Sequence, residues 1–370
     1  MYEEPTKKRN LLIIGTVLIV IIIIVLYFFY SNNHKKIETN SSPSQPVSTT
    51  PKQNEPEAAK VPTEQNVKVT PPVPIPLPVG TDSFVVALKD TNQIIATNLF
   101  NQGYVTDQNA FTTLLSGKDG KGVVVPGGYK ISKEMSDLQL VQVLKGKQYM
   151  KWVVIPEGLR KEEIAKLLSD ALGWTTKQKN KWIKTDTTTK PDYIEGVYFP
   201  DTYLIPTNET TEAVAARLIS KFNENFASYL PEFTAKNIKW TKALTLASIV
   251  QREAANDADA PLIAGILWNR LNQNMQLDVD ATLQYIRGDK GAGFWAPITV
   301  ADKKIDSPYN TYLHTGLPPH PISNPGLPAI DAVLNPTKTD CLYYLHDKNR
   351  VTHCAATYPE HQANILKYLK

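Results

Sequence analysis

The hydrophobic pattern divides the chain into three stretches of different character. Residues 11–30 are almost wholly apolar, and only Gly15 and Thr16 interrupt them. Residues 31–80 are dominated in their first half by Ser, Thr, Asn, Gln and Pro and contain little that could be buried. From about Thr81 onward, apolar residues recur with the periods of strands and helices. The pattern therefore predicts an apolar segment, a linker and an α+β globular part.

The apolar stretch 11–30 predicts a single transmembrane helix, because about 20 apolar residues span a bilayer. The basic residues at 7–9 favour a short cytoplasmic tail, residues 1–10, and an extracytoplasmic body. The alternative is a cleaved signal peptide, whose apolar region is shorter, about 7–15 residues, and ends at a small-residue cleavage site. Residues 31–34 offer no such site. We therefore expect a single-pass cell-membrane protein.

The linker at 31–80 is too polar in its first half to fold, and we expect it to be disordered. Its last part, residues 71–78, holds five prolines and predicts an extended, semi-rigid rod. Such a tether lets the globular part work at some distance from a membrane anchor.

The globular part divides near residue 150 into a small and a larger α+β unit. In 81–150 we expect a strand at 84–88, a helix at 92–103 with Asn92 as its N-cap, a strand at 123–125, a turn at 126–129 and a short helix at 138–144. In 151–370 we expect a strand at 152–155 and helices at 161–172, 211–229, 241–255, 261–271 and 358–369.

Charge and motif content exclude several classes of function. The formal net charge of +4 is too weak, and the basic residues too scattered, to indicate a nucleic-acid partner. Five histidines lie between 314 and 361, but none has the spacing of a metal site. No glycine-rich phosphate loop follows a strand. We expect no metal and no cofactor.

The helix expected at 241–255 carries the best candidate for chemistry. With Leu246 at zero and about 100° per residue, Val250 falls at about 40° and Glu253 at about −20°, within the apolar stripe. A carboxyl on a buried face loses water, which raises its pKa and lets it donate a proton near neutral pH. Two alternatives remain open. Glu253 could pair with a buried arginine such as Arg270, or the stripe could reach solvent at the helix end.

The sequence around Glu253 resembles the signature helix of the YceG-like family of endolytic murein transglycosylases. Further similar segments follow in the family's order along residues 83–370. They are 154–158 (VIPEG), 195–203 (EGVYFPDTY), 247–254 (ASIVQREA), 269–282 (NRL, Met275, DAT), 307–312 (SPYNTY), 316–319 (GLPP) and 357–361 (T, then EH).

This resemblance implies a lytic transglycosylase that cleaves the bond between N-acetylmuramic acid and N-acetylglucosamine without water. The muramyl 6-hydroxyl attacks its own anomeric carbon and leaves a 1,6-anhydro end. Glu253 takes the place of the family's acid and base. The resemblance further implies a LysM-like subdomain at 81–150, a catalytic domain at 151–370, nascent glycan strands as substrate and cell-wall synthesis proteins as partners.

Candidate substrate contacts lie in the similar segments, and each has a structural alternative. The segment 309–312 could stack on sugars or form a turn around Pro308. Asp280 could orient Glu253 or make a structural hydrogen bond, and Glu195 could be a cap. The candidates are Tyr309, Asn310, Thr311, Tyr312, Asp280, Glu195 and Tyr198.

Three positions depart from the family's pattern. Gln251 stands where the family often has Glu, which leaves Glu253 as the carboxyl of this helix. Asp278 replaces a common Gln, and Cys354 an aromatic residue. Two rival functions fit the same sequence: a muramidase that uses water, and a noncatalytic peptidoglycan-binding scaffold.

The two cysteines, Cys341 and Cys354, flank a hairpin candidate. A hairpin centred between Asp347 and Lys348 places them opposite each other, with Cβ atoms about 4.5–5.5 Å apart. An oxidising exterior allows such a pair to form a disulfide. We therefore expect a cross-strand disulfide.

Overall fold

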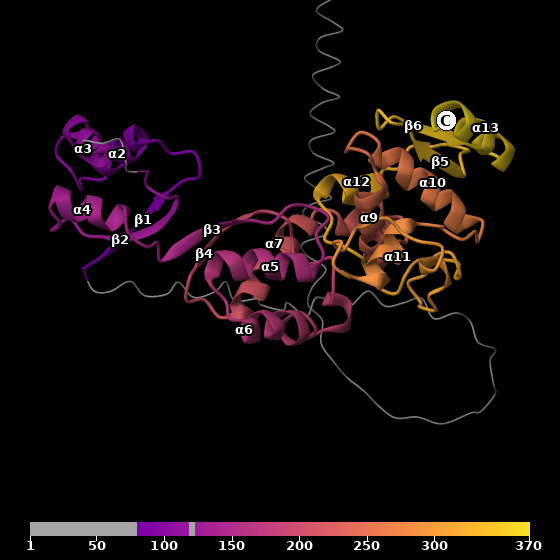
Figure 1. The fold of residues 1–370 in the computed structure, drawn as a ribbon, viewed down its shortest axis with the longest axis horizontal. Helices are drawn as coiled ribbons and strands as arrows, with labels where there is room; N and C mark the ends of the chain where they lie inside the picture. The colour runs from indigo at the N-terminus through magenta and orange to yellow at the C-terminus, as the bar shows by residue number, and fades with distance from the viewer. Residues whose placement is uncertain (1–79, 118–122) are drawn as a thin grey trace, which may run out of the picture. The chain divides into compact units, whose positions relative to one another are not determined.

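The structure is a computed structural model that describes residues 80–117 and 123–370 (Figure 1). The tail and the transmembrane helix expected at 11–30, with nearly all of the linker, lie outside the described residues. Within these residues, no helix is long and apolar enough to span a bilayer. The predicted α+β class is confirmed: an antiparallel sheet of order β1-β2-β3-β4 and a two-stranded sheet, β5-β6, combine with helices.

The first part of the described chain builds its own hydrophobic core. Its elements are β1 (Asp82–Val86), α2 (Asn92–Asn101), α3 (Gln108–Ser116), β2 (Gly127–Ile131) and α4 (Asp137–Leu144). β1 and β2 are antiparallel, with Asp82 opposite Ile131, and the three helices lie beside them (Figure 1). The core includes Phe84, Leu99, Phe111, Tyr129 and Leu140.

Two sequence expectations in this part are wrong. The strand expected at 123–125 starts instead at Gly127, inside the expected turn. A Cβ on Gly127 would lie 2.6 Å from the Met150 carbonyl oxygen, so the glycine is needed where two strands approach closely. The N-cap of α2 is Thr91 rather than Asn92, because its hydroxyl accepts the Ile94 N–H.

The second part contains the remaining elements around a larger core. Its strands are β3 (Met150–Val154), β4 (Thr202–Pro206), β5 (Tyr343–His346) and β6 (Thr352–Ala355). Its α-helices are α5 (Lys161–Leu172), α6 (Thr176–Lys181), α7 (Thr211–Phe226), α8 (Leu230–Ala235), α9 (Trp240–Glu253), α10 (Ala260–Asn272), α11 (Asp280–Arg287), α12 (Leu327–Leu334) and α13 (Tyr358–Tyr368). A π turn (Trp182–Asp186) and 3-10 turns (Pro191–Tyr193 and Asp302–Lys304) join them. β3 pairs with β4 along its length but with β2 only at Gly128 and Met150.

Helix α9 packs against α8, α10, α11 and α12, and the last three lie around it in Figure 1. All residues from Ala243 to Val250 are buried, which is more than the single stripe expected from the sequence. Ser248 can be buried because its hydroxyl donates to the Thr245 carbonyl at 2.7 Å. The helix therefore emerges from the core only towards its two ends, and Glu253 lies at the C-terminal one.

The β5–β6 hairpin has a different register from the expected one. Tyr344, not Cys341, lies opposite Cys354. The carboxylate of Asp347 accepts the N–H groups of Asn349 and Val351, which moves the turn towards the C-terminus.

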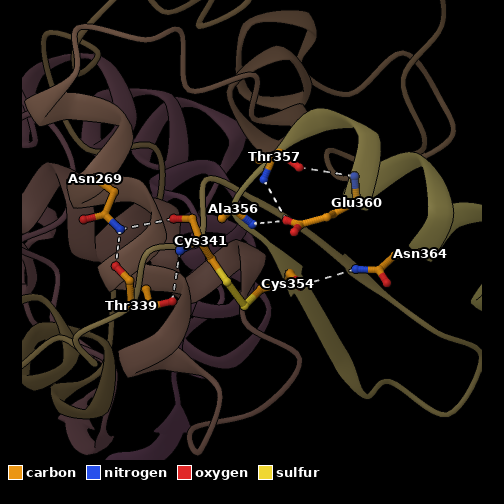
Figure 2. The surroundings of a disulfide bond; sticks show 8 residues. All are labelled: Asn269, Thr339, Cys341, Cys354, Ala356, Thr357, Glu360 and Asn364. Atoms are coloured by element: carbon orange, nitrogen blue, oxygen red, sulfur yellow. Dashed lines mark hydrogen bonds between the residues drawn. A yellow bond between two sulfur atoms is a disulfide. The ribbon is translucent and has the colours of Figure 1, made fainter.

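Cys341 and Cys354 nevertheless form a disulfide, with Cα atoms 5.8 Å apart (Figure 2). Cys341 precedes β5, and the next residue, Leu342, donates its N–H to the Ala355 carbonyl at 2.8 Å. This bond keeps the segment of Cys341 beside β6. The bridge is therefore diagonal to the strand pairs rather than directly across them.

Candidate active site

Glu253 is the last residue of α9, and three separate segments meet at its carboxyl group. The Tyr344 hydroxyl, from β5, donates a 2.7 Å hydrogen bond to Oε2. The backbone N–H of Ala281, in the first turn of α11, also faces the carboxyl, as does the charge of Arg252. Glu253 keeps part of its surface accessible to solvent. The residue is therefore held by the protein at its carboxyl group and is only half-buried as a whole.

The pKa of Glu253 is raised above the usual value of a glutamate. Burial is the largest cause, and the negative charge of Asp280 acts in the same direction. The hydrogen bonds from Tyr344 and Ala281, with the positive charge of Arg252, oppose it. Since burial prevails, the group keeps its proton to higher pH than an exposed glutamate, as a general acid requires.

The alternative partner for Glu253, Arg270, is occupied elsewhere. Its Nε donates to the Leu342 carbonyl at 2.5 Å, and its Nη1 to the Leu277 carbonyl at 2.8 Å. Its ion pair is with Asp278, at 3.2 Å. Arg270 thus fixes the segments before α11 and β5, and both of these segments lead into the surroundings of Glu253.

Asp280 and Tyr312 form a second pair beside Glu253. The Tyr312 hydroxyl donates a 2.6 Å hydrogen bond to Oδ1 of Asp280, and the Asp280 charge acts on Glu253. Asp280 is exposed. This placement brings two of the expected substrate contacts to the candidate acid.

The neighbouring residues Asn310 and Thr311 are buried and bonded internally. Asn310 donates to the carbonyls of Lys303 and Ile305, at 3.2 and 2.8 Å. The Thr311 hydroxyl accepts the Val279 N–H at 3.0 Å. These bonds hold the loop against the start of α11, so they position Tyr312 and Asp280. Neither side chain is exposed where a ligand could contact it.

Tyr309 lies in the same loop, and its ring packs against another aromatic side chain. Its ring is tilted against that of Tyr285, with centroids 5.1 Å apart. It is partly buried, and its part in substrate binding stays a prediction.

Glu195 and Tyr198 are fully buried. The Glu195 carboxylate accepts the Lys161 N–H at 3.1 Å and so caps α5, and burial raises its pKa to about 8. The Tyr198 hydroxyl lies 2.7 Å from the Tyr193 carbonyl oxygen. A glycan could reach neither side chain without rearrangement, and their expected binding role stays a prediction without a supporting contact.

On the other side of the α9 terminus, Arg252 stacks on Trp295. Its guanidinium carbon is 3.8 Å from the ring centroid, and the indole N–H donates to Glu163 at 2.9 Å. Sequence reasoning missed the contact of Arg252 with Trp295 and that of Tyr344 with Glu253. Tyr344 lies 91 residues from Glu253 in sequence, so no local pattern could have revealed the contact.

A cavity of about 210 Å³ opens beside the end of α9. Glu253 is not part of its wall, which includes Gln251, Asn256, Asp257 and Arg350. Among residues 80–117 and 123–370, no group of His, Cys, Asp and Glu side chains could hold a metal ion.

A carboxylic acid with a raised pKa at the end of α9, in an α+β scaffold, has the properties that a general acid needs. The chain belongs to the YceG-like family, whose model matches residues 84–367. A Bacillus subtilis (strain 168) relative named endolytic murein transglycosylase is 30% identical over 297 residues, which cover 74% of this chain and 81% of the relative.

A Streptococcus pneumoniae (serotype 2) protein of the same name is 35% identical over 178 residues, or 48% of this chain. This match spans about a third of the streptococcal protein, 32% of its length. A solved structure of a YceG-like protein from Listeria monocytogenes has a TM-score of 0.56 and 27% identity, and the match covers 77% of this chain and 98% of that one.

Proposed function

We propose that the chain is an endolytic murein transglycosylase with Glu253 as its acid and base. The observation that carries the proposal is the Glu253 carboxyl at the half-buried end of α9, whose pKa burial raises and which Tyr344 holds in place. The name of the Bacillus and Streptococcus relatives gives the substrate class. The substrate is a glycan strand of peptidoglycan.

In the first step, protonated Glu253 gives its proton to the glycosidic oxygen between N-acetylmuramic acid and N-acetylglucosamine. The bond from the anomeric carbon to this oxygen breaks, and the leaving sugar departs with a hydroxyl group. The raised pKa keeps Glu253 protonated before this step. The hydrogen bonds from Tyr344 and Ala281 stabilise the carboxylate that forms.

In the second step, the 6-hydroxyl of the muramyl residue attacks its own anomeric carbon and gives its proton to Glu253. The product is a 1,6-anhydro end, and the acid is regenerated without water. Most glycosidases need two carboxylates, but here the substrate supplies the nucleophile. The intramolecular attack benefits from proximity. Asp280 can therefore remain an electrostatic neighbour of Glu253 rather than a second reacting group.

We further propose that residues 11–30 anchor the protein in the cell membrane, with the N-terminus cytoplasmic and the catalytic part outside. The length of the apolar stretch supports this. An anchor keeps the site near the membrane, where nascent strands and cell-wall synthesis proteins are found. The order β1-α2-α3-β2, with its two strands paired, supports a LysM-like subdomain in 81–150.

The experiment compares the full-length chain with Glu253→Gln on uncrosslinked glycan strands. We expect turnover to fall at least ~10²-fold, the usual contribution of a general acid, while glycan binding in a pull-down is retained. Glu224→Gln, on the exposed surface of α7, is the matched control and should cleave normally. Equal product release by the wild type and Glu253→Gln would identify a different acid, and no release by either would identify a noncatalytic scaffold.

A further inference from the structure

We propose that Tyr344 is a positioning residue for Glu253 and that the disulfide-closed β5–β6 hairpin holds it there. The proposal rests on the proposed function and goes beyond it, because it names a residue that fixes the orientation of the acid. It also makes the bridge between Cys341 and Cys354 part of the support of the active site.

The contact itself is specific. The Tyr344 hydroxyl reaches Oε2 of Glu253 at 2.7 Å, within the usual range for an O–H donor to a carboxyl oxygen. Glu253 ends α9, and the Ala254 backbone that follows is extended. The helix therefore gives no support beyond Glu253, and its carboxyl needs a partner from another element to stay in one orientation.

The hairpin that carries Tyr344 is fixed on either side of this residue. Cys354 lies opposite Tyr344 on β6, and its disulfide joins Cys341, ahead of β5. Asn269 of α10 donates to the Cys341 carbonyl at 3.1 Å, and Asn364 of α13 to the Cys354 carbonyl at 3.3 Å (Figure 2). The bridge thus ties the strand of Tyr344 to elements on both sides of the hairpin.

The titratable groups around the pair come from α9 itself and from three further segments. Asp280 of α11 acts on Glu253, and so does Arg252 of α9. Arg270 of α10 and Tyr312 of the 306–315 loop act on Tyr344. Among the described residues, none of these side chains donates a hydrogen bond to the Glu253 carboxyl, whereas Tyr344 does. Removing the Tyr344 hydroxyl therefore removes the side chain that donates a hydrogen bond to Glu253 and leaves the charged neighbours of Glu253 in place.

The test is Tyr344→Phe in the full-length chain, with kcat/KM for glycan cleavage measured against pH. The Tyr344 hydrogen bond lowers the pKa of Glu253. Loss of this bond should therefore move the alkaline limb of the kcat/KM profile to higher pH, by about one unit. We also expect kcat to fall roughly tenfold with little change in KM, because the acid is misplaced. Tyr343→Phe, whose ring packs on His361, is the matched control and should leave the limb unchanged.

A second arm tests the disulfide. Cys341→Ser with Cys354→Ser should move the limb in the same direction as Tyr344→Phe, by a smaller amount. In a chain that already carries Tyr344→Phe, the two serine substitutions should not move the alkaline limb further. The hydrogen bond between Tyr344 and Glu253, which they would loosen, is already absent there. Additive shifts, or an unmoved limb in the double serine variant, would overturn the role of the bridge.

A carboxyl titration of Glu253 by ¹³C NMR separates this proposal from the proposed function, since it needs no turnover. The Glu253 signal is assigned by its loss in Glu253→Gln. If Tyr344→Phe raises the midpoint, the positioning contact stands even for a chain that cleaves no glycan. If the midpoint and the limb both stay where they are in the wild type, the proposal is overturned.

Discussion

Asn324 donates a 2.6 Å hydrogen bond to Oε1 of Glu195, a residue 129 positions earlier in the chain. The same carboxylate accepts the Lys161 N–H at the start of α5, so one buried acid joins the loop ahead of α12 to α5. Asn324 also accepts the Tyr198 N–H at 2.8 Å. A titrating group at this junction makes the fold itself sensitive to pH.

The first prediction concerns Glu195→Gln. The folded-state pKa of Glu195 is raised to about 8, above that of the unfolded chain, so folding favours the protonated form. Its contribution to stability is full below the unfolded pKa and is lost as pH rises through about 8. Gln cannot titrate. Between acidic and alkaline conditions, the free energy of unfolding of the variant should therefore change by up to a few kcal/mol less than that of the wild type.

Urea unfolding at a series of pH values measures this slope. Glu224→Gln serves as the control, because that side chain is exposed. A Glu195→Gln chain with the same slope as the wild type would show that Glu195 is already ionised in the folded protein.

The second prediction concerns reduction of the Cys341–Cys354 bridge. The bridge closes a loop with a sequence separation of 13, and disulfides of this kind stabilise by about 2–4 kcal/mol. Thermal unfolding should therefore occur at lower temperature with reductant than without it. The double serine variant should match the reduced wild type and not respond to reductant. An unchanged melting temperature on reduction would mean that the hairpin is held by its other contacts alone.

The third prediction concerns Asp280→Asn. The charge of Asp280 raises the pKa of Glu253, so its removal should lower that pKa. Because the active form is protonated, the alkaline limb of kcat/KM should move down, on the order of one pH unit. This is the opposite direction to Tyr344→Phe. Tyr312→Phe removes the hydrogen bond to Asp280 but leaves the Asp280 side chain in place. We therefore expect the alkaline limb of kcat/KM to stay where it is in the wild type. A shift upward for Asp280→Asn would reverse the assigned electrostatics.

The fourth prediction concerns Gly265→Ala in α10. Helix propensity alone predicts a gain of about 1 kcal/mol. However, a Cβ at this position would lie 2.2 Å from the Thr337 carbonyl oxygen, and this backbone atom cannot move aside cheaply. We expect a net loss of about 1–3 kcal/mol in unfolding experiments. Asn272→Ala, at the exposed end of the same helix, should change stability by no more than about 0.5 kcal/mol. A Gly265→Ala chain that is more stable than the wild type would contradict the close approach of α10 to the Thr337 carbonyl.

Helical periodicity predicted the long helices well, because their buried faces follow from the sequence itself. α5 was predicted with its observed bounds, Lys161–Leu172, and α7, α9, α10 and α13 within a few residues. Helices α3, α11 and α12 were not predicted. The strand β2 was misplaced because Gly127 and Gly128 are typical of turns, and only the proximity of Met150 explains them.

The candidate site was predictable only in part. Periodicity selected Glu253, and the family resemblance selected Asp280 and Tyr312, which lie beside it. Tyr344 could not have been found, because it lies 91 residues from Glu253 and only the fold brings the two together. The enclosure of α9 on nearly all sides arises from the helices packed around it, so the pattern of one segment could not reveal it.

Product analysis in water labelled with a heavy oxygen isotope tests the central claim most directly. Full-length protein is incubated with uncrosslinked glycan strands, and the new ends are weighed by mass spectrometry. If Glu253 assists the attack of the muramyl 6-hydroxyl, every new muramyl end is a 1,6-anhydro sugar without the isotope. New reducing ends that carry the isotope would contradict the account and identify a hydrolase that uses water.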